Sequence, residues 1–578
     1  GQPVSEEARD LASKIKDYEA RLLELIKSPQ PDESAIKATR LSLRSKVAKL
    51  VLADAEHASR MDVEVNLFKY AFHRAIDDMR RKRTRAEGNL SDPQKRERAL
   101  KALANIREGL GKFLGEAKGF YTSLLGQLLK RLGLTIEEIE LPEPPAGEQA
   151  PAGPPPAKVR GLMLLSCQRC LTYLGDLERY AQLNRDEGQR DWDAPRAHYL
   201  LGSRLAPHSG LPHHQMAVIA TYTDDDLEAA CSYARSILAA SPHPLGRKNL
   251  LMLHEKNDDK CDALGKRGGR SSGAAYASAT AAEKGRRMGE FSLRFVRLHA
   301  MLYQGNELNS YRGLETSLLV DMLSLVDAGA IDQAALLRMV TVCIFSAHDI
   351  GARLSDCGTN GDSNGAASAA HLARSYNFAL GLCCKVFMKL SIAARGNDRL
   401  LPALCALADW LNHNLGLVAG PLPSDSADNA KELRTTRMAL TEHLVDMLNL
   451  TRGAEGSILE YRPLPEDVEL FGFLPLSAAH KPLLSFSADG TLVGERGVAV
   501  EADAGVARRV RLGRLEALAQ RLAAGAQPVL FYDSQKGEYS VEGIAQGNGV
   551  STLGVHSQQR GMLRLPDGAA QEQAPAGV

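Results

Sequence analysis

The chain of 578 residues has little of what usually marks a secreted, membrane-bound or strongly charged protein. Lys plus Arg (71) nearly equal Asp plus Glu (70), so the formal net charge is +1. Nucleic-acid binding driven by overall charge is therefore not indicated, and any anion site must come from a local cluster. The nine cysteines are an odd number without regular spacing, which favours a reducing cytosol or nucleus over secretion.

Long apolar runs and catalytic signatures are also missing. No uninterrupted apolar run approaches the ~18–20 residues that cross a bilayer, and the chain opens with no signal peptide, so we expect no membrane partner. None of the GxSxG, HExxH, P-loop or Rossmann patterns occurs in its required context. We therefore expect no enzyme, no cofactor and no metal. The first residue is Gly1 instead of Met, which indicates a fragment or an incomplete gene model.

Amphipathic helical patterns fill most of the chain, and 44% hydrophobic residues can bury a sizeable core. Strand patterns are confined to residues 483–498 and 528–532. We predict a mostly α fold in which a helical domain (1–260) precedes a helical-hairpin domain (291–535) with a minor β element near the C-terminus. The Pro-rich composition of segment 141–158 predicts an insert on the protein surface. Segments rich in Gly, Ser and Ala predict a flexible linker at 261–290, a flexible loop at 356–370 and, at 536–578, a tail.

Two features of the first half suggest a helical scaffold that binds a phosphate group on a partner. Tyr199 and Tyr233 are 34 residues apart, which is the period of a tetratricopeptide helix pair. Asp176, Arg179 and Tyr180 stand at i, i+3 and i+4, so they share one helix face. In helices at large, such residues more often form an intrahelical ion pair beside a core tyrosine.

Several stretches together resemble the "ever shorter telomeres" family, whose animal and plant members are the SMG-type adaptors of nonsense-mediated mRNA decay. The resemblance runs from about residue 60 to about residue 535. It rests on residues 170–180 (CLTYLGDLERY), 210–222 (GLPHHQMAVIATY), 233–242 (YARSILAASP), 291–303 (FSLRFVRLHAMLY), 464–476 (LPEDVELFGFLPL), 508–522 (RRVRLGRLEALAQRL) and 528–533 (PVLFYD).

The resemblance implies that residues 1–260 form a 14-3-3-like and tetratricopeptide-like domain. In 14-3-3 folds phosphoserine is held by a Lys and an Arg seven residues apart, and an Arg-Tyr pair on another helix completes the site. Here Arg179 and Tyr180 match that pair, with Asp176 in support. His73 falls on the Lys position and Arg80 on the Arg position. Seven residues turn a helix through ~700°, so these two side chains lie within ~20° of one face.

The histidine is a departure from the family pattern, because an imidazole is half charged only near pH ~6.5. Arg74 is rotated by ~100° from His73 and would reach the site only through its long side chain. Either Arg80, Arg179 and Tyr180 hold phosphate with a partly charged His73, or phosphate recognition is weakened in this chain. The residues alone leave both alternatives open.

Three other motifs have less specific interpretations. The run RRKRTR at residues 80–85 is either a nuclear-localisation or RNA-contacting cluster, or simply a solvated helix end. The CxxC pair of Cys167 and Cys170 has no further zinc ligands nearby and is typical of buried helix cysteines. His214 reads as a polar residue at a helix start.

The resemblance implies a non-enzymatic adaptor of nonsense-mediated mRNA decay, cytoplasmic and nuclear, which binds a phosphorylated RNA helicase of the up-frameshift type. Its other partners would be related decay adaptors or deadenylation and decapping factors. The alternative is a telomerase-associated protein that binds telomerase RNA or single-stranded telomeric DNA. A third reading is a scaffold that has lost phosphate recognition. Some family members end in a PIN nuclease domain, for which we see no matching α/β pattern here.

Overall fold

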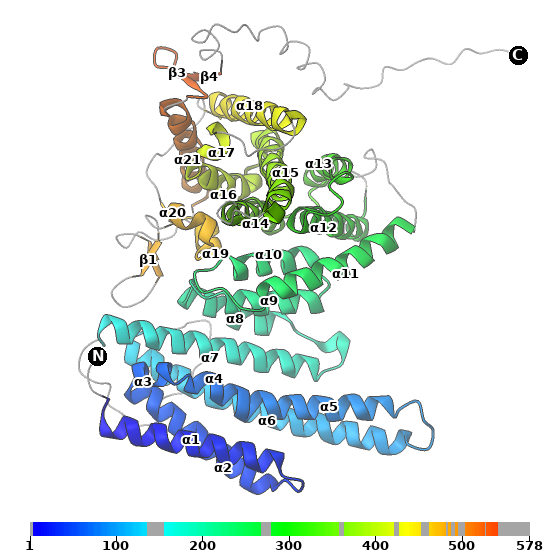
Figure 1. The fold of residues 1–578 in the computed structure, drawn as a ribbon, viewed down its shortest axis with the longest axis vertical. Helices are drawn as coiled ribbons and strands as arrows, with labels where there is room; N and C mark the ends of the chain where they lie inside the picture. Colours follow the sequence, from blue (N-terminus) through cyan, green and yellow to red (C-terminus); the bar gives the residue numbers. More distant parts are fainter. Residues whose placement is uncertain are drawn as a thin grey trace, which may run out of the picture.

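The computed structural model describes residues 4–135, 155–266, 279–357, 363–420, 427–451, 462–480, 484–486, 492–494, 503–525 and 528–541. Helices make up most of them, which confirms the mostly α prediction (Figure 1). The N-terminal helices are α1 (Glu6–Lys27), α2 (Glu33–Ala53), α3 (Ala55–Arg60), α4 (Val63–Leu67), the π-helix η1 (Phe68–His73), α5 (Arg74–Gly88), α6 (Arg96–Leu132) and α7 (Ala157–Leu183).

Local signals explain where several of these helices begin and end. The Ser5 side chain caps α1 by accepting a hydrogen bond from the Ala8 amide, and Asp32 caps α2 in the same way. Helix α6 ends at Gly133, whose φ of 67° is the left-handed conformation that glycine adopts most easily.

The remaining elements continue upward in Figure 1. The middle of the molecule contains η2 (Glu187–Gln189), α8 (Asp193–Leu205), α9 (Leu211–Tyr222), α10 (Asp226–Ile237) and α11 (Gly246–Lys266). The C-terminal half contains α12 (Ala281–Gln304), α13 (Tyr311–Asp327), α14 (Gln333–Cys357), α15 (Ser363–Ala393), η4 (Ala394–Gly396), η5 (Asp398–Leu400), α16 (Leu401–Asn412), α17 (Gly416–Ala419), α18 (Ala427–Thr451), α19 (Pro465–Leu470), η6 (Leu474–Leu476), α20 (Ser477–His480) and α21 (Ala504–Ala524).

Two small antiparallel hairpins confirm a minor β element near the C-terminus. Strands β1 (Leu484–Phe486) and β2 (Leu492–Gly494) pair within the predicted region 483–498. Strand β3 (Phe531–Asp533) overlaps the predicted 528–532 and pairs with β4 (Glu538–Ser540), which extends structure into the predicted tail. Residues 542–578 of that tail lie outside the described residues.

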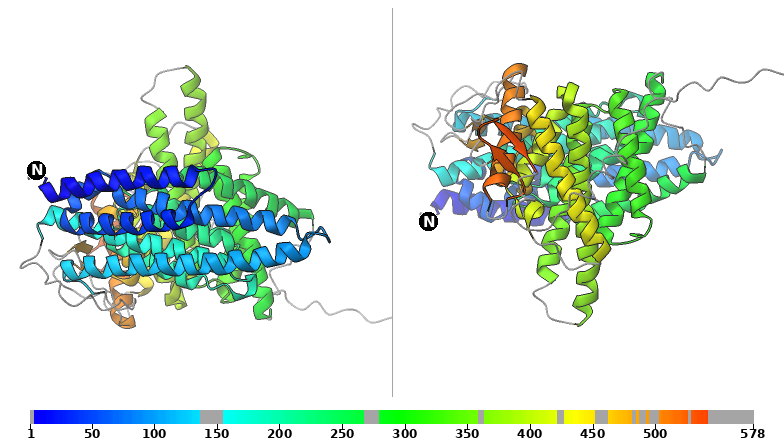
Figure 2. Two further views of the ribbon diagram at one scale, coloured as in Figure 1. Left: turned by 90° about the horizontal axis from the view of Figure 1, so that it is seen from below. Right: turned by 90° about the horizontal axis from the view of Figure 1, so that it is seen from above.

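Two main hydrophobic cores organise the helices. The smaller joins α1 to α7, from Ala8 to Tyr180. The larger extends from Ala217 to Tyr539 and joins α9 through α21 and β4, so its packing crosses the boundary that composition predicted at residue 260. Seen from below, the N-terminal helices lie side by side, and α15, which lies on the far side of the molecule in this view, runs at a steep angle to them (Figure 2).

Helices cover parts of the segments that were predicted to be flexible. Helix α11 continues to Lys266 and α12 starts at Ala281, so both ends of the 261–290 linker are helical, and 267–278 lie outside the described residues. Within the predicted loop 356–370, α14 reaches Cys357 and α15 starts at Ser363. Alanine has the highest helix propensity, which explains why these Ala-containing stretches extend helices. Of the Pro-rich segment, 141–154 lie outside the described residues and α7 begins at Ala157.

Two helical segments in the described chain are long and apolar enough to cross a membrane by length and composition alone: α14 and Ala369–Gly396. Of their most apolar stretches, 78% and 67% of the residues are buried inside the protein. A helix that is apolar on most sides is typical of the centre of a large helical core.

The segment around α19 connects the two halves of the molecule. Gly472 has a φ of 86°, and a Cβ atom there would lie 2.0 Å from the Pro207 carbonyl oxygen, so only glycine fits. The Leu474 amide donates to the Leu238 carbonyl at 2.9 Å. The late motif LPEDVELFGFLPL therefore packs against the α8–α9 turn and the end of α10.

Candidate phosphate-binding site

Three cationic or titratable side chains converge on the ring of Tyr180 in α7. The His73 ring centroid lies 6.3 Å from that of Tyr180. The guanidinium carbons of Arg80 and Arg179 lie 5.4 Å and 4.6 Å from it. Two segments about a hundred residues apart in sequence therefore meet at one aromatic ring.

The local helix geometry places His73 and Arg80 on the same side. His73 is the last residue of η1, and α5 continues from Arg74 with regular α-helical turns. A π-helical turn shifts the face that the following residues present, and such turns are frequent at functional sites. Both side chains are exposed. Arg74 is half-buried, and within the described chain it forms no ion pair or cation–π contact with the other predicted residues.

Arg179 is held rigidly by two buried neighbours. Its Nη2 donates to Asp176 Oδ1 at 2.8 Å, and its Nε donates to the Tyr199 hydroxyl at 3.4 Å. That hydroxyl donates in turn to Asp176 Oδ1 at 2.7 Å. Burial disfavours the charge, yet Tyr199 and Asp176 hold the pKa of Arg179 well above its ordinary value. The guanidinium is therefore a cation that these contacts hold in place, and it is itself buried, with 7% of its surface exposed.

The sequence did not identify Tyr199 as a site residue. It was noted only for its 34-residue spacing from Tyr233. The ring packs directly on Gly175, where a Cβ atom would lie 2.5 Å from Tyr199 Cε1. Glycine at this position therefore lets α8 approach α7 closely enough for the hydroxyl to reach Asp176. The signal available in the sequence was the glycine that precedes the Asp in GDLERY.

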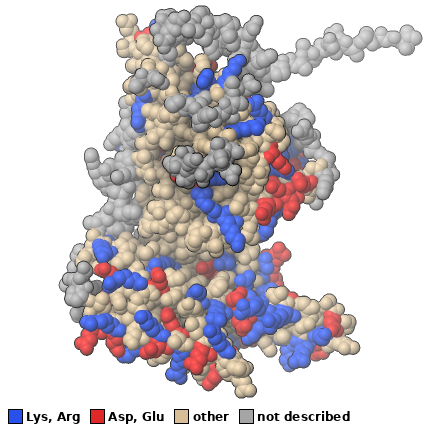
Figure 3. All heavy atoms as spheres, in the orientation of Figure 1, with Lys and Arg blue, Asp and Glu red and all other residues tan. Residues whose placement is uncertain are grey.

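Within the basic run 80–85, neighbouring acidic groups neutralise most of the charge. Arg81 pairs with Asp77 at 2.7 Å and Lys82 with Asp78 at 2.8 Å. Arg83 binds Glu87 and donates to the Leu183 carbonyl, where it caps the end of α7. Figure 3 shows basic and acidic side chains interspersed over these N-terminal helices. Arg80 and Arg85 are both exposed, and no carboxylate among the described residues pairs with either of them.

The two histidines at the start of α9, His213 and His214, are buried. The Nε2 atom of His214 lies 2.9 Å from Asn249 Nδ2, and its ring stacks on His243. Burial, His243 and Arg179 lower the pKa of His214 to about 3, so it is neutral at physiological pH.

The other chemical candidates have structural roles. Cys167 and Cys170 are buried in the smaller core, and burial raises the pKa of both thiols, which makes them unreactive. In the part of the chain that the structure describes, no group of three His, Cys, Asp or Glu side chains could hold a metal ion.

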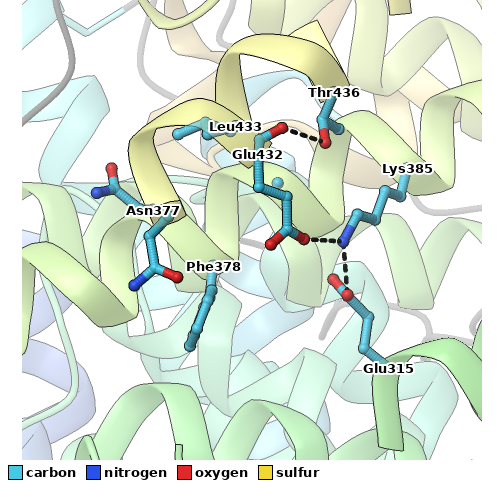
Figure 4. A pocket seen from close by; sticks show the side chains of 9 residues that line it. Glu315, Asn377, Phe378, Lys385, Glu432, Leu433 and Thr436 are labelled. Atoms are coloured by element: carbon cyan, nitrogen blue, oxygen red, sulfur yellow. Dashed lines mark hydrogen bonds and ion pairs between the residues drawn. The ribbon is translucent and has the colours of Figure 1, made fainter. Parts of the chain in front are cut away.

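One pocket lies between α13, α15 and α18. Lys385 fills it, binding Glu315 at 2.6 Å and Glu432 at 3.1 Å (Figure 4). Its empty volume of about 260 Å³, which includes open solvent, is below the ~300–1,000 Å³ of ordinary ligand pockets. The pocket therefore holds an ion-pair network that joins three helices.

The fold is that of a helical scaffold protein, in which Arg80, Arg179 and His73 gather around Tyr180. Residues 62–185 match the family model described as "Telomerase activating protein Est1", and residues 195–480 match the "Est1 DNA/RNA binding domain". The chain belongs to the Est1 family, which also includes the SMG-type proteins.

Two relatives and one solved structure illustrate the similarity. The nonsense-mediated mRNA decay factor SMG7 of Arabidopsis thaliana is 25% identical over 508 residues, covering 77% of this chain and 47% of the relative. SMG7 of Danio rerio is 24% identical, covering 83% and 38%. The chain thus spans less than half the length of these relatives. A structure described as "Crystal structure of Est1 and Cdc13" shares the fold, with a TM-score of 0.62, 14% identity and coverage of 92% of this chain and 99% of that one.

Proposed function

We propose that this chain is a non-enzymatic adaptor of nonsense-mediated mRNA decay, in the cytoplasm and nucleus, that binds a phosphorylated segment of an up-frameshift-type RNA helicase. The single observation that carries the proposal is the convergence of Arg80, Arg179 and His73 on Tyr180. Similarity to two decay factors supports the pathway. The C-terminal helical domain would recruit related decay adaptors or deadenylation and decapping factors.

The site has the chemistry that a phosphoserine requires. Arg179 is a buried cation that Asp176 and Tyr199 hold in place, while Arg80 is exposed and free of carboxylate partners among the described residues. Charge-assisted hydrogen bonds from two guanidinium groups to phosphate oxygens are among the strongest that proteins form. A hydrogen bond to a charged group contributes about 1.5–3 kcal/mol. Loss of one arginine should therefore weaken binding by about 10- to 150-fold.

The test is fluorescence anisotropy of a labelled Ser-Gln phosphopeptide and its unphosphorylated twin with the full chain. We expect phosphate-dependent binding that Arg80→Glu abolishes. Arg81→Glu is a matched control, because Arg81 has the same charge on the same helix but pairs with Asp77. Equal affinity for the two peptides would refute phosphate recognition.

A telomerase-associated role is the second candidate, favoured by the description of the model that matches residues 195–480. It predicts binding of telomerase RNA or single-stranded telomeric DNA with a steep salt dependence. A filter-binding assay across a salt series separates the two functions, because the adaptor reading predicts no preference for these nucleic acids over unrelated sequences.

A further inference from the structure

Trp192 and Tyr222 form an aromatic platform on the surface, at the point where α8 begins and α9 ends. Their rings are stacked, with centroids 5.2 Å apart and an interplanar angle of 6°. Tyr222 is 42% exposed and Trp192 is half-buried. Helices α8 and α9 pack against each other (Figure 1), and Trp192 also packs against the small core that includes Tyr199. The fold therefore holds the two rings in place and leaves aromatic surface for a partner.

No cation of the described chain occupies this platform. Elsewhere the fold places arginines over its aromatic rings, as with Arg353, whose guanidinium carbon lies 5.1 Å from the centre of the Tyr303 ring. Among the described residues, no Lys or Arg lies over the ring of Trp192 or Tyr222. A cation is attracted to the face of an aromatic ring, and to tryptophan most of all. The platform therefore suits a cation that a partner supplies.

Acidic residues flank both rings in the sequence. Asp191 and Asp193 stand on either side of Trp192, and both are exposed. Asp224 follows two residues after Tyr222, and its side chain is 81% exposed. Because consecutive Cα atoms are ~3.8 Å apart, these carboxylates lie close to the rings. A cation that stacks on the platform would meet them, and a phosphate group would be repelled.

Neighbouring cations neutralise only part of this negative charge. Residues 190–196 and 222–228 contain six carboxylates. Four cations belong to these segments or contact their carboxylates, namely Arg190, Arg196, Lys260 and Arg338. Asp191 has no cationic partner among the described residues. The surroundings of the platform therefore keep a surplus of negative charge.

We propose that the Trp192–Tyr222 platform binds an arginine side chain from an arginine-containing segment of a partner protein. The planar guanidinium stacks flat on aromatic faces, which the compact ammonium of lysine does not do. The flanking carboxylates would accept its N–H groups. Bases of single-stranded nucleic acid also stack on aromatic rings, but their phosphates would meet the surplus negative charge. This surface uses none of the residues of the phosphate site, so the inference goes beyond the proposed function and does not depend on it.

The test uses the full chain and two acetylated, amidated peptides, Gly-Arg-Gly-Gly-Arg-Gly and a twin in which citrulline replaces each arginine. Citrulline keeps the planar shape of arginine and lacks its charge. The chain has two tryptophans, and the other, Trp410, is 1% exposed, so a change in tryptophan fluorescence reports on Trp192. We expect a saturable change with the arginine peptide and an affinity for the citrulline peptide that is lower by at least about two- to fivefold, the factor that an exposed cation–π contact supplies.

Variants locate the binding, measured by anisotropy of labelled peptides. Tyr222→Ala should weaken binding of the arginine peptide by about two- to fivefold, and the double variant Asp191→Asn, Asp193→Asn should weaken it as well. Phe531→Ala is the matched control, because it removes a similarly exposed ring (49%) on β3 and should bind as wild type does. Circular dichroism checks that the variants remain folded.

Two kinds of result would overturn the inference. One is equal affinity of wild type for the arginine and citrulline peptides, or wild-type affinity for the arginine peptide in Tyr222→Ala. The other concerns a labelled oligothymidylate of about ten nucleotides. If it binds wild type more tightly than the arginine peptide does and loses this binding in Tyr222→Ala, the platform stacks bases instead of arginine.

Discussion

Replacing Tyr199 by Phe tests whether the buried hydroxyl fixes Arg179. The change keeps the ring that packs on Gly175 and removes only the hydroxyl, which donates to Asp176 at 2.7 Å and accepts from Arg179 at 3.4 Å. Hydrogen bonds to charged groups contribute about 1.5–3 kcal/mol each, and the contact with Asp176 is the shorter one. We therefore expect the free energy of unfolding to fall by about 1.5–3 kcal/mol. Phosphopeptide affinity should fall as well, because Arg179 loses a contact that orients it.

Tyr121→Phe is the matched control. Tyr121 is equally buried, but its hydroxyl has no hydrogen-bond partner among the described residues. Removal of an unpaired buried hydroxyl should be neutral or slightly stabilising. Urea denaturation followed by circular dichroism gives the stabilities, and anisotropy gives the ratio of affinities for phosphorylated and unphosphorylated peptides. If both variants have wild-type stability and the same ratio, the hydroxyl does not organise the site.

The remaining predictions concern packing, a buried ion network and the histidine. Gly175→Ala should destabilise the protein by about 1–3 kcal/mol in urea denaturation, since the new Cβ atom would overlap Tyr199. Arg514→Met should cost about 3–5 kcal/mol in the same assay, because the buried Asp467 carboxylate, which Arg514 contacts at 2.6 Å, would lose its guanidinium partner. Burial and a second nearby carboxylate raise the pKa of Asp409 to about 7, above the ~3.9 of an unfolded chain. The protonated Asp409 carboxyl therefore contributes fully to the free energy of unfolding below pH ~4, and this contribution is lost as the pH rises to about 7. Asp409→Asn should remove this part of the pH dependence of stability. His73→Lys should tighten phosphopeptide binding at pH 7.5, measured by anisotropy, because lysine is fully charged there; an unchanged affinity would show that the side chain does not face the phosphate.

The sequence brought together the three side chains that lie around Tyr180, namely His73, Arg80 and Arg179. A seven-residue spacing puts His73 and Arg80 on one face, and the family pattern joins them to Arg179 and Tyr180. Tyr199 could not be found in this way, because its contact with Asp176 depends on how closely α8 packs on α7. A single glycine controls that distance.

The errors in the organisation of the chain have a similar cause. Composition predicted a linker and a loop where Ala-containing segments extend α12 and α15, because small residues are typical of both flexible chain and helix. The continuity of the larger core across residue 260 depends on the packing of α10 against α12 and α14, which lie far away in sequence. Such contacts are properties of tertiary packing and leave no local pattern.

A double-mutant cycle between Arg80 and the ligand phosphate tests the central claim most directly. It requires four affinities, those of wild type and Arg80→Gln for the phosphorylated and unphosphorylated peptides. A direct contact predicts a coupling free energy of at least ~1 kcal/mol between Arg80 and the phosphate. The ratio of affinities for the phosphorylated and unphosphorylated peptides would then be at least fivefold smaller in Arg80→Gln than in wild type. A preference that is the same in both proteins would mean that the phosphate does not touch Arg80, and would contradict the proposed site.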